Sequence, residues 1–230
     1  MKTKNMKKKM LLLILATTGL FSCKQGSKSE EGAGAVEVSN SKEKGKGQKL
    51  LSNPVYKFID TQYKYVDAAG QHLIIENSLP KGGLKYTAPD GKVYVYAVFW
   101  TRITNETVNP FTLTIDFPVD SFEFPSSPER YFKILIPSDT MTLEKVSLFN
   151  YGLSNLKPFL DSAIHKPSSL KRTINPNESN VFYFVILSYK GVNGTLRTGL
   201  NLKGQDLFYR INDKVIACGK INLKDFTLQK

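Results

Sequence analysis

The sequence predicts an all-β fold in which antiparallel sheets pack face to face as a β-sandwich, with one or two short helices. Three observations lead to this prediction. Residues 93–100 and 181–187 are apolar or aromatic at every position, residues 111–117 alternate strictly between apolar and polar, and turns rich in Pro, Gly and Asn separate such segments. Roughly seven to ten strands of this kind with little helix are typical of sandwiches, and they argue against a parallel sheet with helical crossovers.

The first predicted strands precede residue 91. Val55–Val66 interleaves Tyr, Phe and Val with polar residues, and His72–Ile75 is a short apolar run. Pro80–Gly83 and Ala88–Gly91 combine Pro and Gly in the way typical of turns. Two strands and two turns are therefore expected here.

The strongest strand signal begins at Val93. The unbroken apolar run to Trp100 predicts a central strand that is covered on both faces. Thr101–Asn105 extends this strand toward a turn at Asn109–Pro110. In Phe111–Phe117 the odd-numbered residues are apolar and the even-numbered ones polar, so the odd-numbered side chains are expected to face a core.

Helices are expected only in the middle of the chain. Residues 118–128 contain three prolines and are predicted to be irregular, before a strand at Tyr131–Ile136. Thr142–Phe149 places apolar residues at three-residue steps, which predicts a short helix, and Leu156–Ile164 is predicted to form a second helical turn. Later strands are predicted at 168–174, 181–187, 195–202, 207–211 and 215–223, with a tight hairpin at 212–214.

The N-terminal 23 residues have the layout of a secretory signal. Met1–Lys9 contains five lysines and no acidic residue, Met10–Phe21 is a largely apolar run of twelve residues, and the small residue Ser22 precedes Cys23. Twelve helical residues span about 18 Å, whereas the hydrocarbon core of a bilayer is about 30 Å thick. A signal peptide over residues 1–22 is therefore expected, rather than a membrane span.

The end of this run, Leu20-Phe21-Ser22-Cys23, resembles the lipobox of bacterial lipoproteins. The resemblance implies cleavage between Ser22 and Cys23 and attachment of acyl chains such as palmitate to Cys23. Two or three acyl chains hold a protein on a membrane far better than one does. We therefore expect a protein anchored to membrane lipid through Cys23 in the cell envelope, at the outer membrane, with the leaflet left open. The alternative is an ordinary cleaved signal that ends at a cysteine.

Residues 23–52 differ in composition from the rest of the mature chain. They are rich in Lys, Glu, Gly and Ser, they contain no aromatic residue, and Val36 and Val38 are their only β-branched aliphatic residues. So polar a segment buries too little apolar surface to offset the entropy of ordering. We expect a flexible polar tether over 23–52 and one β-sandwich domain over 53–230.

The net charge and the cysteine count limit the function classes. Removal of residues 1–22 with their five lysines lowers the net charge from +12 to +7, which is ordinary for a soluble surface. Nucleic-acid binding needs basic residues clustered on one element, so no nucleic-acid partner is expected. Cys23 and Cys218 are the only cysteines. With Cys23 acylated no intramolecular disulfide forms, and Cys218 is expected to be a small buried hydrophobic residue.

Candidate catalytic residues are few. His72 and His165 are the only histidines. Asp161, Ser162 and His165 are the residue types of a catalytic triad, but members of a triad usually come from separate elements rather than from one loop. No enzyme activity is expected.

Candidate metal ligands are equally few. Two histidines exclude a His-rich metal site by count. One hypothesis is a calcium site made by Asp116, Asp120 and Glu123, because Ca²⁺ prefers carboxylate ligands. The simpler interpretation is that these acidic side chains are exposed to solvent. No metal and no cofactor are expected.

Tyr94, Tyr96 and Trp100 lie at even-numbered positions of one predicted strand, so their side chains share one face. If exposed, they would form a candidate aromatic binding face that stacks on a sugar ring or anchors a protein partner. The alternative, which the unbroken apolar run favours, is packing against the second sheet. Exposure of Trp100 decides between the two.

Two motifs lie further apart in the chain. The strand within Gly91–Asn105 ends in Thr-Asn-Glu-Thr, and the turn Ile174–Ser179 contains Pro-Asn-Glu-Ser before an apolar strand. With these motifs, residues 85–190 resemble the small immunoglobulin-like sandwich domains of bacterial envelope lipoproteins. The resemblance implies an immunoglobulin-like β-sandwich and a role in binding or scaffolding.

The expected function is therefore a non-catalytic binding or scaffold module for an envelope protein or glycan partner. One alternative is a carbohydrate-binding accessory lipoprotein. The other is a hydrolase built on loops 116–128 and 150–167.

Overall fold

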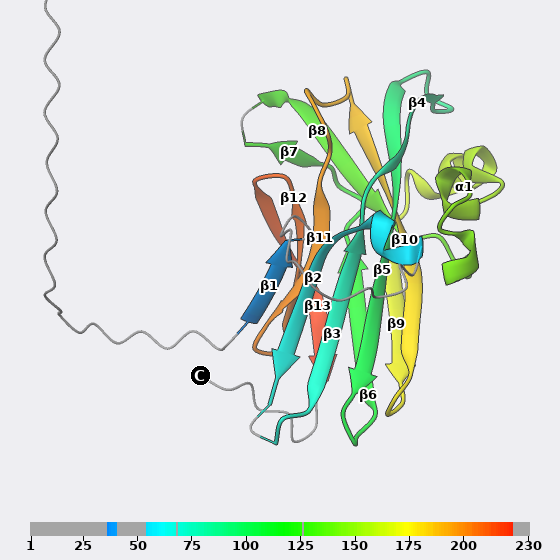
Figure 1. Ribbon diagram of the computed structural model, residues 1–230. Coiled ribbons are helices and arrows are strands. Elements are labelled where there is room, and N and C mark those ends of the chain that lie inside the picture. Colours follow the sequence, from blue (N-terminus) through cyan, green and yellow to red (C-terminus); the bar gives the residue numbers. More distant parts are fainter. Residues whose placement is uncertain (1–35, 41–53, 68, 126, 223–230) are drawn as a thin grey trace, which may run out of the picture. The chain divides into compact units, whose positions relative to one another are not determined.

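Two antiparallel sheets form the β-sandwich that the sequence predicts (Figure 1). The computed structural model describes residues 36–40, 54–67, 69–125 and 127–222. The predicted cleavage and lipidation residues, Ser22 and Cys23, lie outside these ranges. Within them, the chain contains thirteen strands, one α-helix and three short 3-10 helices, which confirms the all-β prediction with short helices.

The first sheet is built around the long strand β5. Its strands follow the order β1 (Val36–Asn40), β2 (Ile59–Val66), β3 (His72–Ser78), β5 (Val93–Glu106), β10 (Ser179–Tyr189), β8 (Ser127–Leu135) and β7 (Phe122–Phe124). The remaining strand, β4 (Lys81–Thr87), pairs with the first half of β5, whereas β3 pairs with its second half. β3 and β4 thus follow one another along the same edge of β5.

The second sheet has the order β11 (Thr198–Lys203), β12 (Asp206–Ile211), β13 (Lys214–Asn222), β6 (Phe111–Phe117) and β9 (Ser168–Ile174). In β6 the odd-numbered side chains are buried and the even-numbered ones are not, as the alternation predicted. The helices are η1 (Pro54–Phe58), η2 (Leu143–Lys145), η3 (Phe149–Gly152) and α1 (Leu156–Ala163).

An aromatic-rich core fills the space between the sheets. Phe184 of β10 lies 4.4 Å from Tyr209 of β12 between ring centroids, and Phe117 of β6 meets both rings edge to face at 6.2 and 5.7 Å. All three side chains are almost fully buried. Complete burial of such a side chain contributes about 1.5–3 kcal/mol, so contacts of this kind hold the two sheets together.

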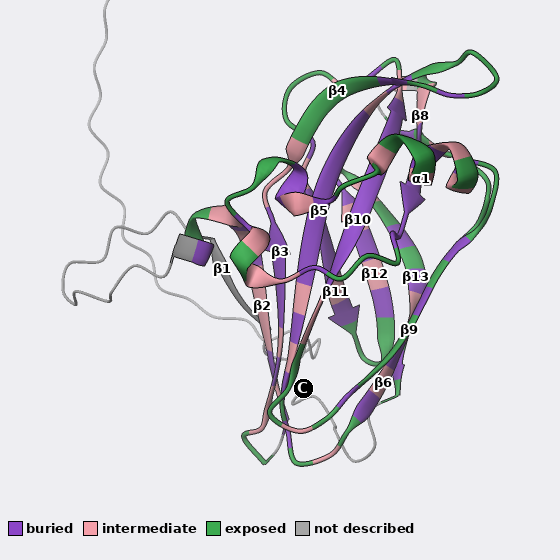
Figure 2. Ribbon diagram, turned by 90° about the vertical axis from the view of Figure 1, so that its right-hand side faces the viewer, coloured by how far each residue is buried: buried purple, intermediate pink, exposed green. Residues whose placement is uncertain are grey.

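A second hydrophobic core lies on the other face of the first sheet. The segment 137–167, which we call the cover segment, includes η2, η3 and α1 and packs Tyr151 and Leu160 onto this face. Figure 2 shows β5 and β10 as buried along most of their length. The two cores together explain why β5 and β10 are apolar at successive positions.

This arrangement corrects the expectation for the aromatic face of β5. Tyr94, Tyr96 and Trp100 are all buried, so they do not form an exposed binding face. They pack beneath the cover segment rather than against the second sheet. Trp100, for example, meets the ring of Tyr151 edge to face at 6.3 Å.

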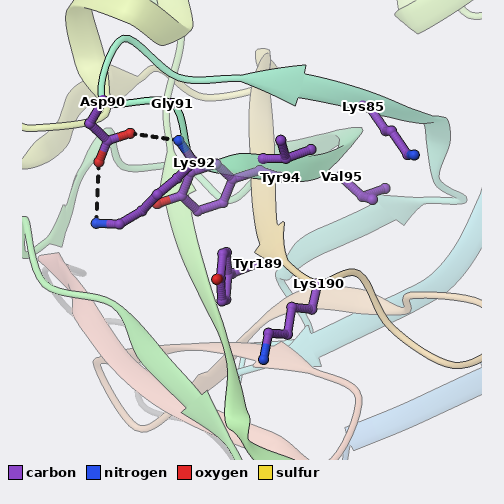
Figure 3. Close-up of a pocket in the computed structure, with 9 residues that line it drawn as sticks. Lys85, Asp90, Gly91, Lys92, Tyr94, Val95, Tyr189 and Lys190 are labelled. Carbon is purple, nitrogen blue, oxygen red and sulfur yellow. Dashed lines mark hydrogen bonds and ion pairs between the residues drawn. The ribbon is translucent and has the colours of Figure 1, made fainter.

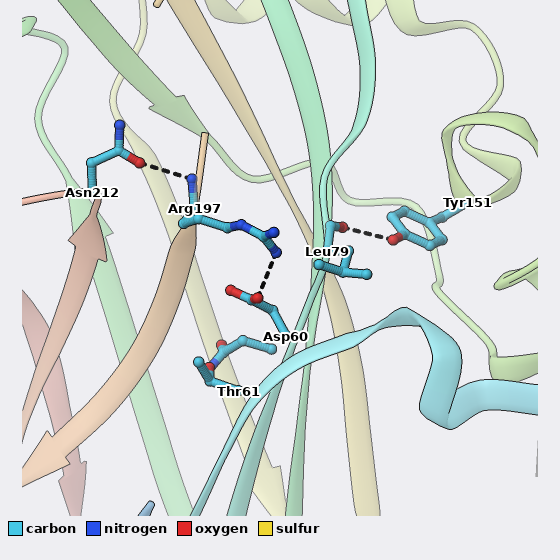
Figure 4. Close-up of polar contacts among 7 residues, drawn as sticks. Asp60, Thr61, Leu79, Tyr151, Arg197 and Asn212 are labelled. Atoms are coloured by element: carbon cyan, nitrogen blue, oxygen red, sulfur yellow. Dashed lines mark hydrogen bonds and ion pairs between the residues drawn. The ribbon is translucent and has the colours of Figure 1, made fainter. Parts of the chain in front are cut away.

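The predicted helix at 142–149 is wrong over most of its length, because the chain there forms two separate 3-10 turns. Leu148, between the two turns, has an extended backbone with φ of −72° and ψ of 155°, which a continuous helix does not allow. The next two residues after Phe149, Asn150 and Tyr151, adopt left-handed conformations with φ of 48° and 56°. The hydroxyl of Tyr183 donates to the Tyr151 carbonyl at 2.7 Å, and the Tyr151 hydroxyl donates to the Leu79 carbonyl at 2.6 Å (Figure 4). These bonds hold the strained turn. The second predicted helix is confirmed as α1.

Two further segments differ from expectation. The turn predicted at Pro80–Gly83 becomes strand β4 from Lys81 onward. Gly82 has φ of +111°, and a Cβ on it would lie 3.0 Å from the Tyr96 carbonyl oxygen, so glycine here permits a bulge in the strand rather than a chain reversal. The stretch predicted to be irregular contains the short strand β7 and the start of β8.

Strand β1 lies within the segment predicted to be a flexible tether. It pairs antiparallel with β2, from Val36 opposite Tyr65 to Asn40 opposite Thr61. Val36 and Val38 are the β-branched residues of this segment, and such residues favour strands. The tether prediction is therefore wrong for residues 36–40, and its other residues, 23–35 and 41–52, lie outside the described ones.

Polar contacts also tie the two sheets together. The hydroxyl of Tyr65 on β2 accepts a hydrogen bond from the backbone N–H of Leu202 on β11 at 2.7 Å. Arg197, just before β11, forms an ion pair with Asp60 on β2 at 2.5 Å, and its backbone N–H donates to Asn212 (Figure 4). The sandwich thus closes through directional bonds as well as apolar contacts.

Cys218 lies at a bulge of β13, where the register with β12 shifts. Its thiol is buried and donates to the Leu207 carbonyl at 3.4 Å. Burial raises the pKa of the Cys218 thiol to about 12, so the thiol stays protonated at neutral pH. The prediction that Cys218 is a small buried residue is confirmed.

Candidate functional site

A row of four tyrosines crosses one end of the first sheet, on the face that bears the cover segment. Tyr86 of β4 is paired with Tyr94 of β5, and Tyr94 is paired with Tyr189 of β10. Tyr131 of β8 stacks on Tyr189 with ring centroids 4.7 Å apart and planes at 16°. Four adjacent strands thus each supply one aromatic ring.

Two of the four tyrosines are buried, and the other two are partly exposed. Tyr86 and Tyr94 are buried, whereas Tyr131 and Tyr189 are half-buried. The Tyr94 ring meets Tyr189 and Tyr131 edge to face at 5.9 and 6.3 Å. The buried pair therefore fixes the position of the two rings that a ligand can reach.

Hydrogen bonds fix Tyr86, at the β4 end of the row. The Tyr86 hydroxyl donates to the carboxylate of Asp161 on α1 at 2.8 Å, and Lys157 bonds the same carboxylate at 2.7 Å. Burial, followed by the bond to Asp161, raises the pKa of Tyr86 above its ordinary range. Burial likewise raises the pKa of Tyr94. Both hydroxyls are hydrogen-bond donors at neutral pH.

A cavity of about 650 Å³ opens beside the row (Figure 3). Tyr94 and Tyr189 lie at the centre of the view, and three lysines surround them. The remaining lining comes from the turn before β5 and from two valines; the residues are Lys85, Asp90, Gly91, Lys92, Val93, Tyr94, Val95, Tyr189 and Lys190.

A second cavity of about 310 Å³ adjoins the first and shares Asp90, Lys92 and Tyr94 with it. Its other walls come from the chain around β7, from β8 and from the end of the cover segment; they are Ser121, Glu123, Tyr131, Lys133 and His165. We call the two cavities together the tyrosine–lysine groove, defined by Tyr94, Tyr131, Tyr189, Lys85, Lys92, Lys133 and Lys190.

The groove has more cationic than anionic side chains, with four lysines against Asp90 and Glu123. Asp90 accepts a hydrogen bond from the Lys92 backbone N–H at 3.1 Å and forms an ion pair with its ammonium at 3.2 Å. The backbone bond, with help from the ammonium, lowers the pKa of Asp90. Asp90 is therefore ionised, and its charge is largely matched by Lys92.

The other lysines have no such partner. Among the described residues, Lys85, Lys133 and Lys190 form no ion pair within 4.0 Å. The Lys133 ammonium donates to the Val119 carbonyl at 2.6 Å, and burial lowers its pKa. The Lys190 ammonium lies over the Tyr189 ring, 5.5 Å from its centroid.

Of the aromatic residues singled out in the sequence, only Tyr94 lines the groove. Tyr96 and Trp100 pack in the same core under the cover segment but line neither cavity of the groove. The sequence reasoning missed Tyr131 and Tyr189, whose apolar strands gave a strand signal but no sign of which rings would become neighbours. Strand register sets that arrangement, and register was not predicted.

The candidate triad residues do not form a relay. The Ser162 hydroxyl donates to the Phe159 carbonyl at 2.9 Å, and Asp161 bonds Tyr86 and Lys157. His165 is exposed and lines the second cavity with Ser121 and Glu123. In the part of the chain that the structure describes, no hydrogen bond joins His165 to a serine or an acid.

The metal hypothesis is also unsupported by the geometry. Across residues 36–40, 54–67, 69–125 and 127–222, no three His, Cys, Asp or Glu side chains gather as metal ligands. Asp116, Asp120 and Glu123 are thus not brought together. His72 instead pairs with Glu106 at 3.1 Å on neighbouring strands.

No known family, curated protein or solved structure matches this chain. None of the described helices is long and apolar enough to cross a bilayer. A function is therefore inferred from the tyrosine–lysine groove and from the N-terminal sequence alone.

Proposed function

We propose that this protein is a lipid-anchored lipoprotein of the bacterial cell envelope, at the outer membrane, and that it binds a glycan without catalysis at the tyrosine–lysine groove. The anchor is inferred from residues 1–23. Glycan binding is inferred from one observation: the stacked, half-exposed rings of Tyr131 and Tyr189 beside a cavity rimmed by lysines.

Three properties of the groove support binding of a sugar. Its larger cavity, about 650 Å³, falls within the range of about 300–1,000 Å³ usual for small-ligand sites. Tyrosine presents an apolar ring face with a polar tip, which suits the apolar face and hydroxyls of a sugar. The buried partners Tyr86 and Tyr94 hold the two reachable rings, and a preorganised site loses less entropy on binding.

Substitution of Tyr189 tests the proposed site. Tyr189→Ala is expected to weaken glycan binding about tenfold or more, equivalent to at least about 1.4 kcal/mol, because it removes one of the two reachable rings. Tyr189→Phe keeps the ring and should keep most of the affinity. Isothermal titration with a glycan selected from an oligosaccharide array measures both.

The matched control is Tyr56→Ala, because Tyr56 is 56% exposed on η1 and does not line the groove. Thermal unfolding checks that each variant is folded. Equal affinity of the Tyr189→Ala and Tyr56→Ala variants would place the glycan elsewhere.

Cys23→Ala tests the anchor. Loss of the sulfur that would bear the acyl chains is expected to move the protein from the membrane fraction to the soluble fraction. Cys218→Ala, which changes the other cysteine, should stay with the membrane. Fractionation with mass spectrometry of the mature N-terminus measures both, and an unchanged distribution of the Cys23→Ala protein contradicts the lipobox interpretation.

A protein partner is the second candidate, and strand β4 favours it. Among the described residues β4 pairs with β5 alone, and Leu84 on it is 51% exposed. An unpaired strand edge can accept a strand of another protein. Crosslinking from residue 84 in cells distinguishes this role from glycan binding.

A further inference from the structure

We infer that the tyrosine–lysine groove selects anionic glycans, in which a carboxylate or phosphate group lies beside a sugar ring. This inference rests on the glycan binding proposed above and specifies its ligand class. It depends on the lysines of the groove, not on the tyrosines.

The first reason is the unmatched positive charge. Three of the four lysines, Lys85, Lys133 and Lys190, lack a carboxylate within 4.0 Å among the described residues. Asp90 is already held by Lys92. An incoming anion therefore meets ammonium groups that form no ion pair within the described residues, and it has no carboxylate to displace from them.

The second reason is the backbone at Lys190. This residue has φ of +61°, a left-handed conformation that costs a non-glycine residue about 1 kcal/mol. It places a lysine at the end of β10, where its ammonium lies over the Tyr189 ring. Strain kept at a cavity rim is a common sign of a functional position.

The third reason is the partial burial of Lys133. Lys133 is a half-buried residue that lines the second cavity with Tyr131, and its ammonium bonds the backbone carbonyl of Val119. Burial disfavours the charged ammonium of Lys133, and the negative charge of Asp120 offsets this effect only in part. A bound carboxylate or phosphate would supply further compensation.

The arrangement of rings and charges matches one ligand shape. Figure 3 shows Tyr94 and Tyr189 between Lys92 and Lys190, with Lys85 on the far side of the cavity. A sugar ring against the tyrosines would thus have cations at its edges, where acidic substituents project. Lys85, Lys92 and Lys190 surround the larger cavity and Lys133 lines the adjoining one, whereas a nucleic-acid backbone would need an extended track of cations.

Binding of charged and neutral sugars to the full chain in detergent tests the inference. The carboxylate pair is trigalacturonic acid and its methyl ester, and the phosphate pair is phosphorylated maltotriose and maltotriose. We expect at least one charged member to bind about tenfold tighter than its neutral counterpart, and the preference to shrink in high salt. The pair that shows the preference identifies the anion.

Lysine variants connect the preference to the groove. Lys190→Gln and Lys85→Gln are each expected to weaken binding of the charged sugar about fivefold and to leave the neutral sugar unchanged. Lys190→Arg should retain the preference. Lys203→Gln on β11, which lines neither cavity, is the matched control.

Three results would overturn the inference, and they differ in whether the proposed glycan binding is still supported. Equal binding of charged and neutral members removes the anion preference but keeps glycan binding. A preference that survives Lys190→Gln and Lys85→Gln places the anion outside the groove. Binding of none of the four sugars at millimolar concentration overturns the inference, and if the oligosaccharide array also yields no ligand, the proposed function falls with it.

Discussion

Gly219→Ala is expected to lower the free energy of unfolding by at least about 3 kcal/mol, enough to unfold a domain of ordinary stability at physiological temperature. Gly219 lies in β13 opposite Ile115 of β6, with φ of +154°. A Cβ on this residue would lie 1.9 Å from the Thr114 carbonyl oxygen. The obstacle is backbone of the paired strand, so no side-chain rotation relieves it.

Gly204→Ala is the matched control for this clash. Gly204 also has a positive φ, +63°, but a Cβ there would have no atom within 4 Å. Its cost is expected to be only about 1–2 kcal/mol, from the left-handed backbone alone. Urea unfolding followed by the fluorescence of Trp100, the single tryptophan, measures both. Similar decreases in the free energy of unfolding for the two variants would contradict the predicted clash, because they would mean that β13 and β6 move apart easily at Gly219.

Asn77→Leu is expected to lower the free energy of unfolding by about 3–5 kcal/mol. The Asn77 amide is buried and makes four hydrogen bonds. Its nitrogen donates to the Thr61 hydroxyl at 3.2 Å and to the Leu200 carbonyl at 3.0 Å. Its oxygen accepts from the Thr101 hydroxyl and from the Leu200 N–H, both at 2.9 Å. The substitution leaves all four partners buried and unpaired.

Because Leu200 belongs to β11, this side chain also links the two sheets. Asn193→Leu is the control, since Asn193 is exposed and accepts one hydrogen bond from Arg130. This substitution should lower the free energy of unfolding by less than about 1 kcal/mol. Chemical denaturation of both variants gives the comparison. A loss below about 1 kcal/mol for Asn77→Leu would show that the sheets close without these bonds.

The fold was predictable where local pattern and burial agree. The run from Val93 to Trp100 predicted a strand covered on both faces, and the alternation in Phe111–Phe117 predicted one buried face; both are confirmed. The glycines at 82 and 83 were misinterpreted as a turn, because glycine in a bulged strand gives the same sequence signal. Only the pairing of this segment with β5, where the register shifts opposite Tyr96, distinguishes a bulged strand from a turn.

The candidate site was less predictable, for a physical reason. The rings of the tyrosine row come from β4 and β5, which are consecutive in the chain, and from β8 and β10, which are distant from them and from each other. Their alignment depends on long-range pairing, which hydrophobic pattern alone does not determine. The expectation for Trp100 failed similarly: the pattern indicated a covered face, but not that the cover would be a looped segment instead of the second sheet.

The first sheet is shared by two hydrophobic cores, one on each face, so the two cores can in principle open separately. Detachment of the cover segment would cost the contacts of Tyr151 and Leu160 but leave the Phe117, Phe184 and Tyr209 cluster closed. Subglobal opening of this kind is a general property of proteins. The ligand-facing tyrosines pack against the core under the cover segment, so they depend on that side of the sheet rather than on the core between the sheets.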